Sequence, residues 1–171
     1  MTDFGFMFKS APDLSWHGGA RYFGAPRDGG KRKHGGCDVI KPPYEQMYAV
    51  ADGVLVHEEK YFYLDTWYVT YQHGTFLCRY GEILHGSTHG AKIGHKVKRG
   101  DPIAKVGLMS LKEGSKAHYD PKGARGHMLH FEMYAKGNDH STLRSAKGPY
   151  KRRADIIDPA PYLDDWVKRL P

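Results

Sequence analysis

The chain has 171 residues, of which 40% are hydrophobic and 13% aromatic, and its formal net charge is +7. This composition is typical of a globular protein and excludes a disordered chain. Two cysteines are too few for a disulfide framework, and because they do not form a Cys-x-x-Cys pair they exclude a thiolate zinc ribbon.

The positive charge favours a polyanionic partner, which is nucleic acid, anionic lipid or an acidic cell-wall polymer. Basic residues cluster at 31–33 and 151–153, and the simplest interpretation of both clusters is solvated loop charge. Residues 1–16 lack the apolar run of a Sec signal peptide, and no stretch reaches the length of a membrane span. We therefore expect synthesis in the cytoplasm, no transmembrane anchor, and delivery to any extracytoplasmic substrate by lysis or a secretion machine.

The 21 glycines and 10 prolines suit many short strands better than long helices. Residues 1–30 are interrupted by glycine and proline and predict an irregular segment. Residues 47–59, 61–72 and 75–84 alternate between apolar and polar and are rich in β-branched and aromatic side chains. With a turn at His73-Gly74, these three strands form an antiparallel meander.

Further strands are expected within 97–107 and over 127–137, where His130 and Glu132 share one face and Phe131 lies on the other. Residues 158–170 predict a short amphipathic helix with prolines near its start. The fold class is thus mainly β, an antiparallel sheet of the sandwich or split-barrel kind, with long loops around a groove and a C-terminal helix. The predicted loop walls of the groove are residues 13–33, 85–96, 108–126 and 138–156.

We predict one domain over residues 1–171. Its parts are the irregular N-terminal segment 1–30, the core 31–137, and the loop and helix 138–171.

The stretch HGGCD, residues 34–38, carries a histidine and an aspartate four residues apart. In a straight strand these two side chains would be separated by about 13 Å, too far to share a metal ion. Gly35-Gly36 allows the backbone to bend and bring them together. A turn that happens to contain a histidine remains the alternative. His130 is a third candidate ligand, and its alternative is a partly buried strand histidine with no metal.

These segments together resemble the lysostaphin/LytM-type zinc endopeptidases, which cleave peptidoglycan cross-links. That family shows H-x-G-x-D, matched here by HGGCD, and a lead-in matched by FGAPR at residues 23–27. The resemblance extends in order from Tyr22 to Tyr134. Its other matching stretches are MYAVADGVLV (47–56), VTYQHGTFLCRYG (69–81), GHKVKRGDPIAKVG (94–107) and LHFEMY (129–134).

The resemblance implies that His34, Asp38 and His130 hold zinc, and that a zinc-activated water attacks an amide carbonyl. Two positions depart from the family. Glu82, in RYGEIL, replaces a catalytic histidine, and Met128 replaces the first histidine of the family's H-x-H. A glutamate can serve as the general base. We therefore assign catalysis to Glu82 and His127, although a regular strand would turn His127 away from the metal.

The alternative for Glu82 is a surface carboxylate in a salt bridge, and for His127 a histidine on the outer face. If His127 does not stabilise the oxyanion, loop histidines His85, His89 and His118 are further candidates. Strand alternation predicts Tyr80 on the face of Glu82, lining the cleft, and Arg79 off that face. The candidates for orienting a ligand or contacting substrate are Glu132, Tyr80, Arg79 and His118.

We therefore expect a zinc-dependent peptidoglycan hydrolase that cleaves a peptide bond in the stem or cross-link, acting as a phage lysin or a secreted antibacterial effector. An effector would have an immunity protein as partner. Two alternatives stay open. One is a non-catalytic cell-wall-binding or regulatory domain that retains the metal. The other is a basic nucleic-acid-binding β domain, which we disfavour because the basic residues are not interleaved with aromatics, so that no nucleic-acid partner is expected.

Overall fold

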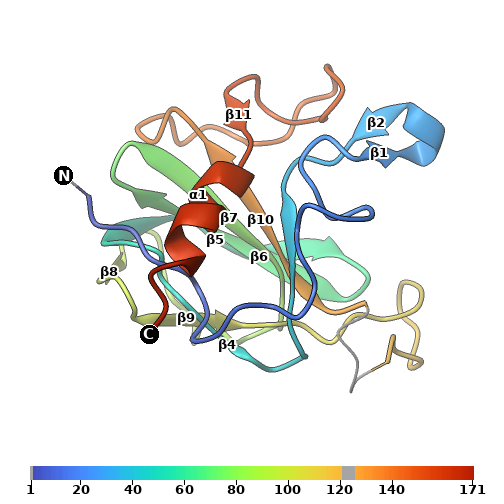
Figure 1. Ribbon diagram of the computed structural model, residues 1–171, viewed down its shortest axis with the longest axis horizontal. Coiled ribbons are helices and arrows are strands. Elements are labelled where there is room, and N and C mark those ends of the chain that lie inside the picture. The colour runs from blue at the N-terminus through green and yellow to red at the C-terminus, as the bar shows by residue number, and fades with distance from the viewer. Residues whose placement is uncertain (1, 121–125) are drawn as a thin grey trace.

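A computed structural model describes residues 2–120 and 126–171 of the protein. Its main feature is a seven-stranded antiparallel sheet in the order β11-β10-β7-β6-β5-β8, with β3 also paired to β10. Figure 1 shows this sheet at the centre of the molecule. Its strands are β3 (Cys37–Ile40), β5 (Gly53–Tyr63), β6 (Thr66–His73), β7 (Phe76–Ile83), β8 (Lys96–Val97), β10 (Met128–Tyr134) and β11 (Ile156–Ile157).

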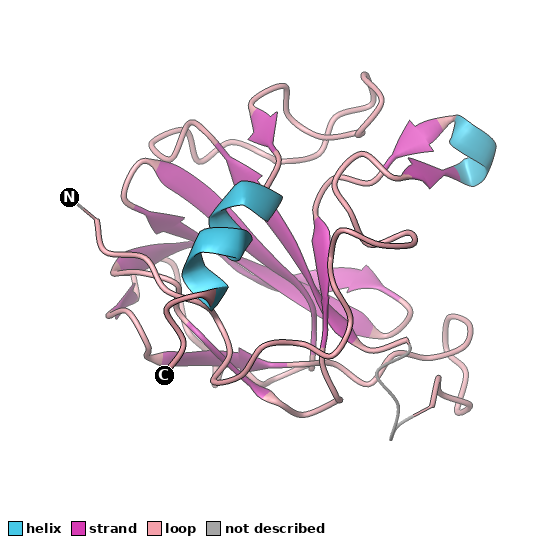
Figure 2. Cartoon of the chain, in the orientation of Figure 1, coloured by secondary structure: helices cyan, strands magenta, loops and turns pink. Residues whose placement is uncertain are grey.

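Two small antiparallel sheets accompany it. The pair β1 (Pro26–Arg27) and β2 (Arg32–Lys33) forms a hairpin around the 3-10 turn η1 (Asp28–Gly30), and this hairpin projects from one side of the molecule (Figure 1). The other pair is β4 (Gln46–Tyr48) and β9 (Pro102–Lys105). Few helical residues are present, as Figure 2 shows, and the C-terminal helix α1 spans Ala160–Val167.

One face of the main sheet is covered by α1 and the N-terminal segment. Leu163 and Trp166 of α1 are buried, and the Trp166 ring stacks on Phe4 with centroids 5.2 Å apart. Phe131 of β10 faces this core and meets Trp166 edge-on. Because alternate residues of a strand point to opposite faces, His130 is left on the other side of the sheet.

The predicted mainly β fold and the β5-β6-β7 meander are confirmed. The expected single strand 47–59 is instead two strands, because the chain turns between β4 and β5 and β4 pairs with β9. The hairpin turn between β5 and β6 falls at Leu64 and Asp65, which both have positive φ, at 49° and 60°. Leucine is not a typical residue for such a turn, so no local signal marked it.

The segment predicted irregular, 1–30, ends in regular structure, since β1 and η1 occupy residues 26–30. Residues 121–125 of the predicted wall 108–126 lie outside the described residues. Both cysteines, Cys37 and Cys78, are buried free thiols. Among the residues described, none belongs to a helix long and apolar enough to cross a bilayer.

Candidate functional site

His34, Asp38 and His130 meet on the face of the sheet opposite α1. Asp38 of β3 is directly paired with His130 of β10, and His34 lies just before β3. His34 Nε2 is 3.0 Å from His130 Nδ1 and 3.1 Å from Asp38 Oδ1, and His130 Nδ1 is 3.0 Å from the same carboxylate oxygen. All three residues are buried. Three potential ligand atoms therefore form a nearly equilateral triangle.

Gly36 allows the bend that joins His34 to Asp38. A Cβ at this position would lie 2.4 Å from the Phe131 carbonyl oxygen and 3.0 Å from His130 Cε1. The loop thus approaches the backbone of β10 so closely that only glycine fits. This close approach keeps His34 and Asp38 next to His130 of β10.

Replacing Gly36 by alanine is expected to lower the free energy of unfolding by about 1–3 kcal/mol, because the backbone must move away from β10. Zinc affinity should fall as well, since His34 moves with that loop. Chemical denaturation and zinc titration measure the two effects. Gly35→Ala is the matched control, because a Cβ there would meet side-chain atoms of Arg152 and Ile156 no closer than 3.4 Å and no backbone atom among its nearest contacts. Equal effects of both variants would contradict the assignment.

Hydrogen bonds fix the orientation of both imidazole rings. His34 Nδ1 donates to the Tyr22 carbonyl oxygen at 3.0 Å, and His130 Nε2 donates to Glu132 Oε1 at 2.9 Å. In the neutral rings, His34 Nε2 and His130 Nδ1 then carry lone pairs and no proton. Two unprotonated nitrogens and a carboxylate oxygen would then face one another, an arrangement that either a bound metal ion or a proton on one ring must hold together.

The triangle fits zinc. Ligand atoms about 2.0–2.1 Å from a tetrahedral zinc ion lie about 3.3–3.4 Å apart, close to the separations found here, and two histidines with a carboxylate leave the fourth position open. Burial lowers the pKa of His130, but hydrogen bonds to Asp38 and Glu132 outweigh it and raise that pKa to about 9. The metal-free cluster therefore holds a proton that zinc must displace.

Glu132 lies beneath the triangle and is fully buried. Its carboxylate accepts from Arg152 Nε at 2.9 Å and lies 3.4 Å from Arg79 Nη1. Burial would raise the pKa of Glu132, but the two guanidiniums hold it well below the usual range. A permanently charged carboxylate therefore orients His130, as in the carboxylate–histidine pairs of zinc sites.

Glu82 of β7 lies at a β-bulge. Trp67 pairs with Ile83 and Tyr68 with Gly81, so Glu82 is an extra residue with no partner on β6. Its φ is 61°, in the left-handed region where a residue other than glycine is strained. The bulge reverses the alternation of β7 at this point, so that Glu82 lies on the face of His130.

The Glu82 carboxylate is buried and only partly satisfied. Oε1 accepts a hydrogen bond of 2.7 Å from the Tyr63 hydroxyl, and Oε2 has no partner among the described residues. Burial, together with the nearby Asp38 carboxylate, raises the pKa of Glu82 well above its usual value. Burial and Glu82 also raise the pKa of Tyr63, so its phenol stays protonated. Glu82 is thus suited to accept a proton.

The bulge corrects two sequence-based expectations. Tyr80 does not line the cleft. It lies in the core on the opposite face, where its hydroxyl contacts His73 Nε2 at 3.0 Å and accepts from the Val50 N–H. Arg79 lies on the face of Glu82 and Glu132 rather than off it, and its guanidinium packs over the Tyr68 ring. Regular alternation gave the wrong faces because it does not anticipate an inserted residue.

The structure does not bring the other candidate histidines to the triangle. His127 is buried on the far side, where its Nδ1 accepts from the Met109 N–H at 3.2 Å. His118 is exposed and pairs with Ser110 in the 108–120 loop. His85 bonds to Glu59 and stacks on Trp67, and His89 is exposed in the same loop. None of the four lines the cleft described next.

A cleft of about 410 Å³ opens over the triangle. The predicted walls 13–33 and 138–156 contribute to it, whereas the described residues of 85–96 and 108–126 do not. The β5-β6 hairpin forms a wall that was not predicted. Sequence reasoning missed its residues because the aromatic run before the turn resembles an ordinary strand. The lining residues are Arg27, Arg32, His34, Gly35, Asp38, Phe62, Tyr63, Glu82, His130, Arg144 and Arg152.

The sequence matches the model of one known protein family. The family described as Peptidase family M23 matches residues 32–142. No curated protein sequence matches the chain.

Solved structures share the fold at low sequence identity. A protein described as cbpa from L. salivarius REN is 17% identical, with a TM-score of 0.60, over 96% of this chain and 97% of that one. The catalytic domain of the antimicrobial peptidase lysostaphin from Staphylococcus simulans is 18% identical, with a TM-score of 0.55, over 85% and 90%. A zinc-containing peptidase from Vibrio cholerae is 19% identical, with a TM-score of 0.52, over 92% of this chain but only 40% of its own length.

Proposed function

This chain belongs to peptidase family M23, and on that premise we propose that it is a zinc-dependent endopeptidase that hydrolyses a peptide bond in peptidoglycan. The resemblance to lysostaphin/LytM-type enzymes is confirmed at the level of the family. The observation that carries the proposal is the triangle of His34, Asp38 and His130, whose ligand atoms lie 3.0–3.1 Å apart. It supports zinc because two imidazole nitrogens and a carboxylate oxygen at this spacing match the ligand set and geometry of a tetrahedral zinc site with one open position.

In the proposed mechanism the three triangle residues hold the ion, which when bound supplies a Lewis acid that makes water nucleophilic near neutral pH. Glu82 acts as the general base and takes the proton of the attacking water. A buried carboxylate with a raised pKa is well matched to that task. Tyr63 holds Glu82 through its hydroxyl and keeps the carboxylate in the cleft. Glu132 keeps His130 in the tautomer that presents Nδ1.

A metal-binding domain without catalysis is the second candidate, and a specific observation favours it. Neither Glu82 nor Met128 is the histidine that the resemblance leads one to expect. On that alternative the triangle would still bind zinc, and the cleft would bind peptidoglycan without cleaving it. A peptidoglycan substrate implies action in the periplasm or cell wall. The delivery route, an effector or lysin role, and an immunity protein stay predictions.

Incubation of the zinc-loaded protein with intact peptidoglycan, with and without a chelator, tests the proposal. Mass spectrometry of the soluble products is expected to show chelator-sensitive release of peptides with a new amino terminus, because amide hydrolysis leaves one. The position of that terminus identifies the bond. Peptidoglycan from several sources that stays uncut, with zinc present in the protein, would overturn the proposed hydrolysis and favour the binding domain.

A further inference from the structure

The two basic clusters of the sequence lie side by side at the cleft. The Lys33 N–H, at the end of the first cluster, donates to the Pro149 carbonyl oxygen at 2.8 Å. Phe23 stacks on Tyr150 with ring centroids 4.7 Å apart. The β1-β2 hairpin is thereby joined to the loop that precedes β11, on the same side of the molecule (Figure 1). Charges more than a hundred residues apart in sequence thus form one wall.

Four arginines line the cleft over the triangle, against two carboxylates, Asp38 and Glu82. Both carboxylates already have roles, as a ligand and as the base. Two of the arginines have acidic partners outside the lining, since Arg152 is paired with Glu132 and Arg32 with Asp28. Bound zinc would add two further positive charges. The cleft therefore carries an excess of positive charge, which a neutral amide substrate would leave unbalanced.

Arg144 is the arginine without a partner. It is exposed, and within the described part of the chain its guanidinium forms no ion pair. Its backbone is bridged to that of Arg152, which places the two residues side by side in the chain segments of one wall. Arg27, on the β1-β2 hairpin joined to this loop, places its Nη2 3.6 Å from Asp38 Oδ2, next to the triangle. A guanidinium that forms no other ion pair can donate two parallel hydrogen bonds to a carboxylate.

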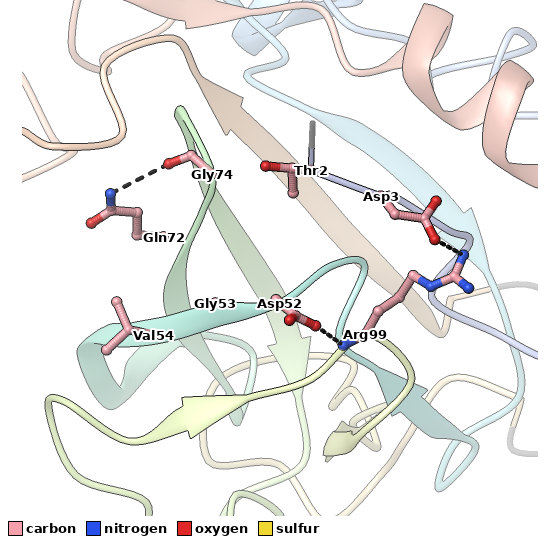
Figure 3. Close-up of a pocket in the computed structure, with 8 residues that line it drawn as sticks. All are labelled: Thr2, Asp3, Asp52, Gly53, Val54, Gln72, Gly74 and Arg99. Atoms are coloured by element: carbon pink, nitrogen blue, oxygen red, sulfur yellow. Dashed lines mark hydrogen bonds and ion pairs between the residues drawn. The ribbon is translucent and has the colours of Figure 1, made fainter.

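Another large cavity of the protein contains no such unpaired arginine among its described lining residues. It measures about 910 Å³, lies beside Thr2 and Asp3 of the N-terminal segment (Figure 3), and shares no lining residue with the cleft over the triangle. Its charged residues satisfy one another, since Arg99 pairs with Asp3 at 3.2 Å and its N–H donates to Asp52. This pairing leaves no free positive charge for a ligand. The cleft over the triangle therefore differs from this cavity in having an arginine, Arg144, with no ion-pair partner among the described residues.

We propose that Arg144 binds a free carboxylate of the substrate, close to the scissile amide, with Arg27 and Arg152 adding to the positive field. This inference rests on the proposed function and names its substrate class. The substrate is an acidic peptide in which a carboxylate flanks the cleaved bond. In peptidoglycan such a bond occurs where the cross-link runs through a diamino acid that keeps its own carboxylate free. A bridge of uncharged glycines would not engage Arg144.

Two synthetic cross-link peptides test the proposal, identical except that the flanking carboxylate is free in one and a carboxamide in the other. Binding is measured by calorimetry on zinc-loaded protein carrying Glu82→Gln, which prevents turnover. The free acid is expected to bind about tenfold more tightly, as one charge-assisted hydrogen-bonded pair at a partly exposed site provides. Introducing Arg144→Gln into the Glu82→Gln protein should abolish most of this preference for the free acid. Arg99→Gln, the matched control, should leave it intact.

Equal binding of the two peptides, or an unchanged preference in Arg144→Gln, would overturn the proposal. These outcomes are distinct from failure of the proposed function. In the protein with Glu82 intact, that failure would appear as both peptides staying uncut while binding still depends on Arg144. Cleavage of both peptides at equal kcat/KM would instead support the hydrolase and reject the carboxylate site.

Discussion

Replacing Glu82 by glutamine is expected to lower kcat by about 10²–10⁴-fold while leaving the zinc content unchanged. Glutamine keeps the shape of the side chain but cannot take a proton from water. Glu82 is outside the triangle of potential ligand atoms, so its loss should not release the metal. A glutamate that only formed a surface salt bridge would give no such loss of rate.

The same substitution is expected to stabilise the metal-free protein. The pKa of Glu82 is raised on folding, from an ordinary value of 4.5. The folded chain therefore keeps a proton that the unfolded chain has lost, and its stability falls as the pH rises from about 4.5 through the raised folded pKa. Glutamine removes this cost. The gain in unfolding free energy at pH 8 should be at least about 1 kcal/mol, and it should vanish at pH 4.

Steady-state kinetics on peptidoglycan fragments and urea denaturation at the two pH values measure both effects. Glu58→Gln is the matched control, because Glu58 is a surface residue that pairs with Lys92 at 3.2 Å. Its rate should match that of the unaltered protein. Retention of full activity by Glu82→Gln would show that another group takes the proton, and destabilisation at pH 8 would contradict the buried, poorly satisfied carboxylate.

Much of the proposed metal site could be predicted from sequence, because its determinants are local. His34, Gly36 and Asp38 lie within one short stretch, and His130 lies in a strand whose apolar face is evident. The position of Glu82 could be read from its place in RYGEIL. The face of the sheet on which the Glu82 side chain lies could not be predicted, because a β-bulge leaves no reliable mark on a sequence in which the extra residue is not glycine.

Residues that come from distant loops were missed for a different reason. Tyr63, Arg27 and Arg144 lie in three separate segments, and each reads locally as an ordinary strand or loop residue. Their meeting depends on the turn at Leu64 and Asp65 and on the joining of the β1-β2 hairpin to the 138–156 loop. Such long-range contacts have no periodicity that sequence reasoning can detect.

Replacing Asp38 by asparagine is expected to remove zinc and activity together. The variant keeps the volume of the side chain but takes away the only negative charge among the three ligand atoms. Zinc affinity should fall by more than the roughly 10–100-fold that loss of an outer hydrogen-bond partner costs, because a ligand itself is altered. The two imidazole nitrogens that remain do not balance the charge of the ion. Activity at limiting zinc should fall in proportion to occupancy.

Metal analysis after dialysis, and thermal unfolding with and without added zinc, provide the measurement. Zinc at a thousand times its Kd should stabilise the unaltered protein by about 4 kcal/mol, and the same zinc concentration should do little for Asp38→Asn. Asp165→Asn is the matched control, since Asp165 is an exposed residue of α1 that pairs with Arg169. Equal stabilisation of all three proteins would mean that zinc binds elsewhere. The acceptors at 3.0–3.1 Å would then have to be held together by the proton on His130 alone.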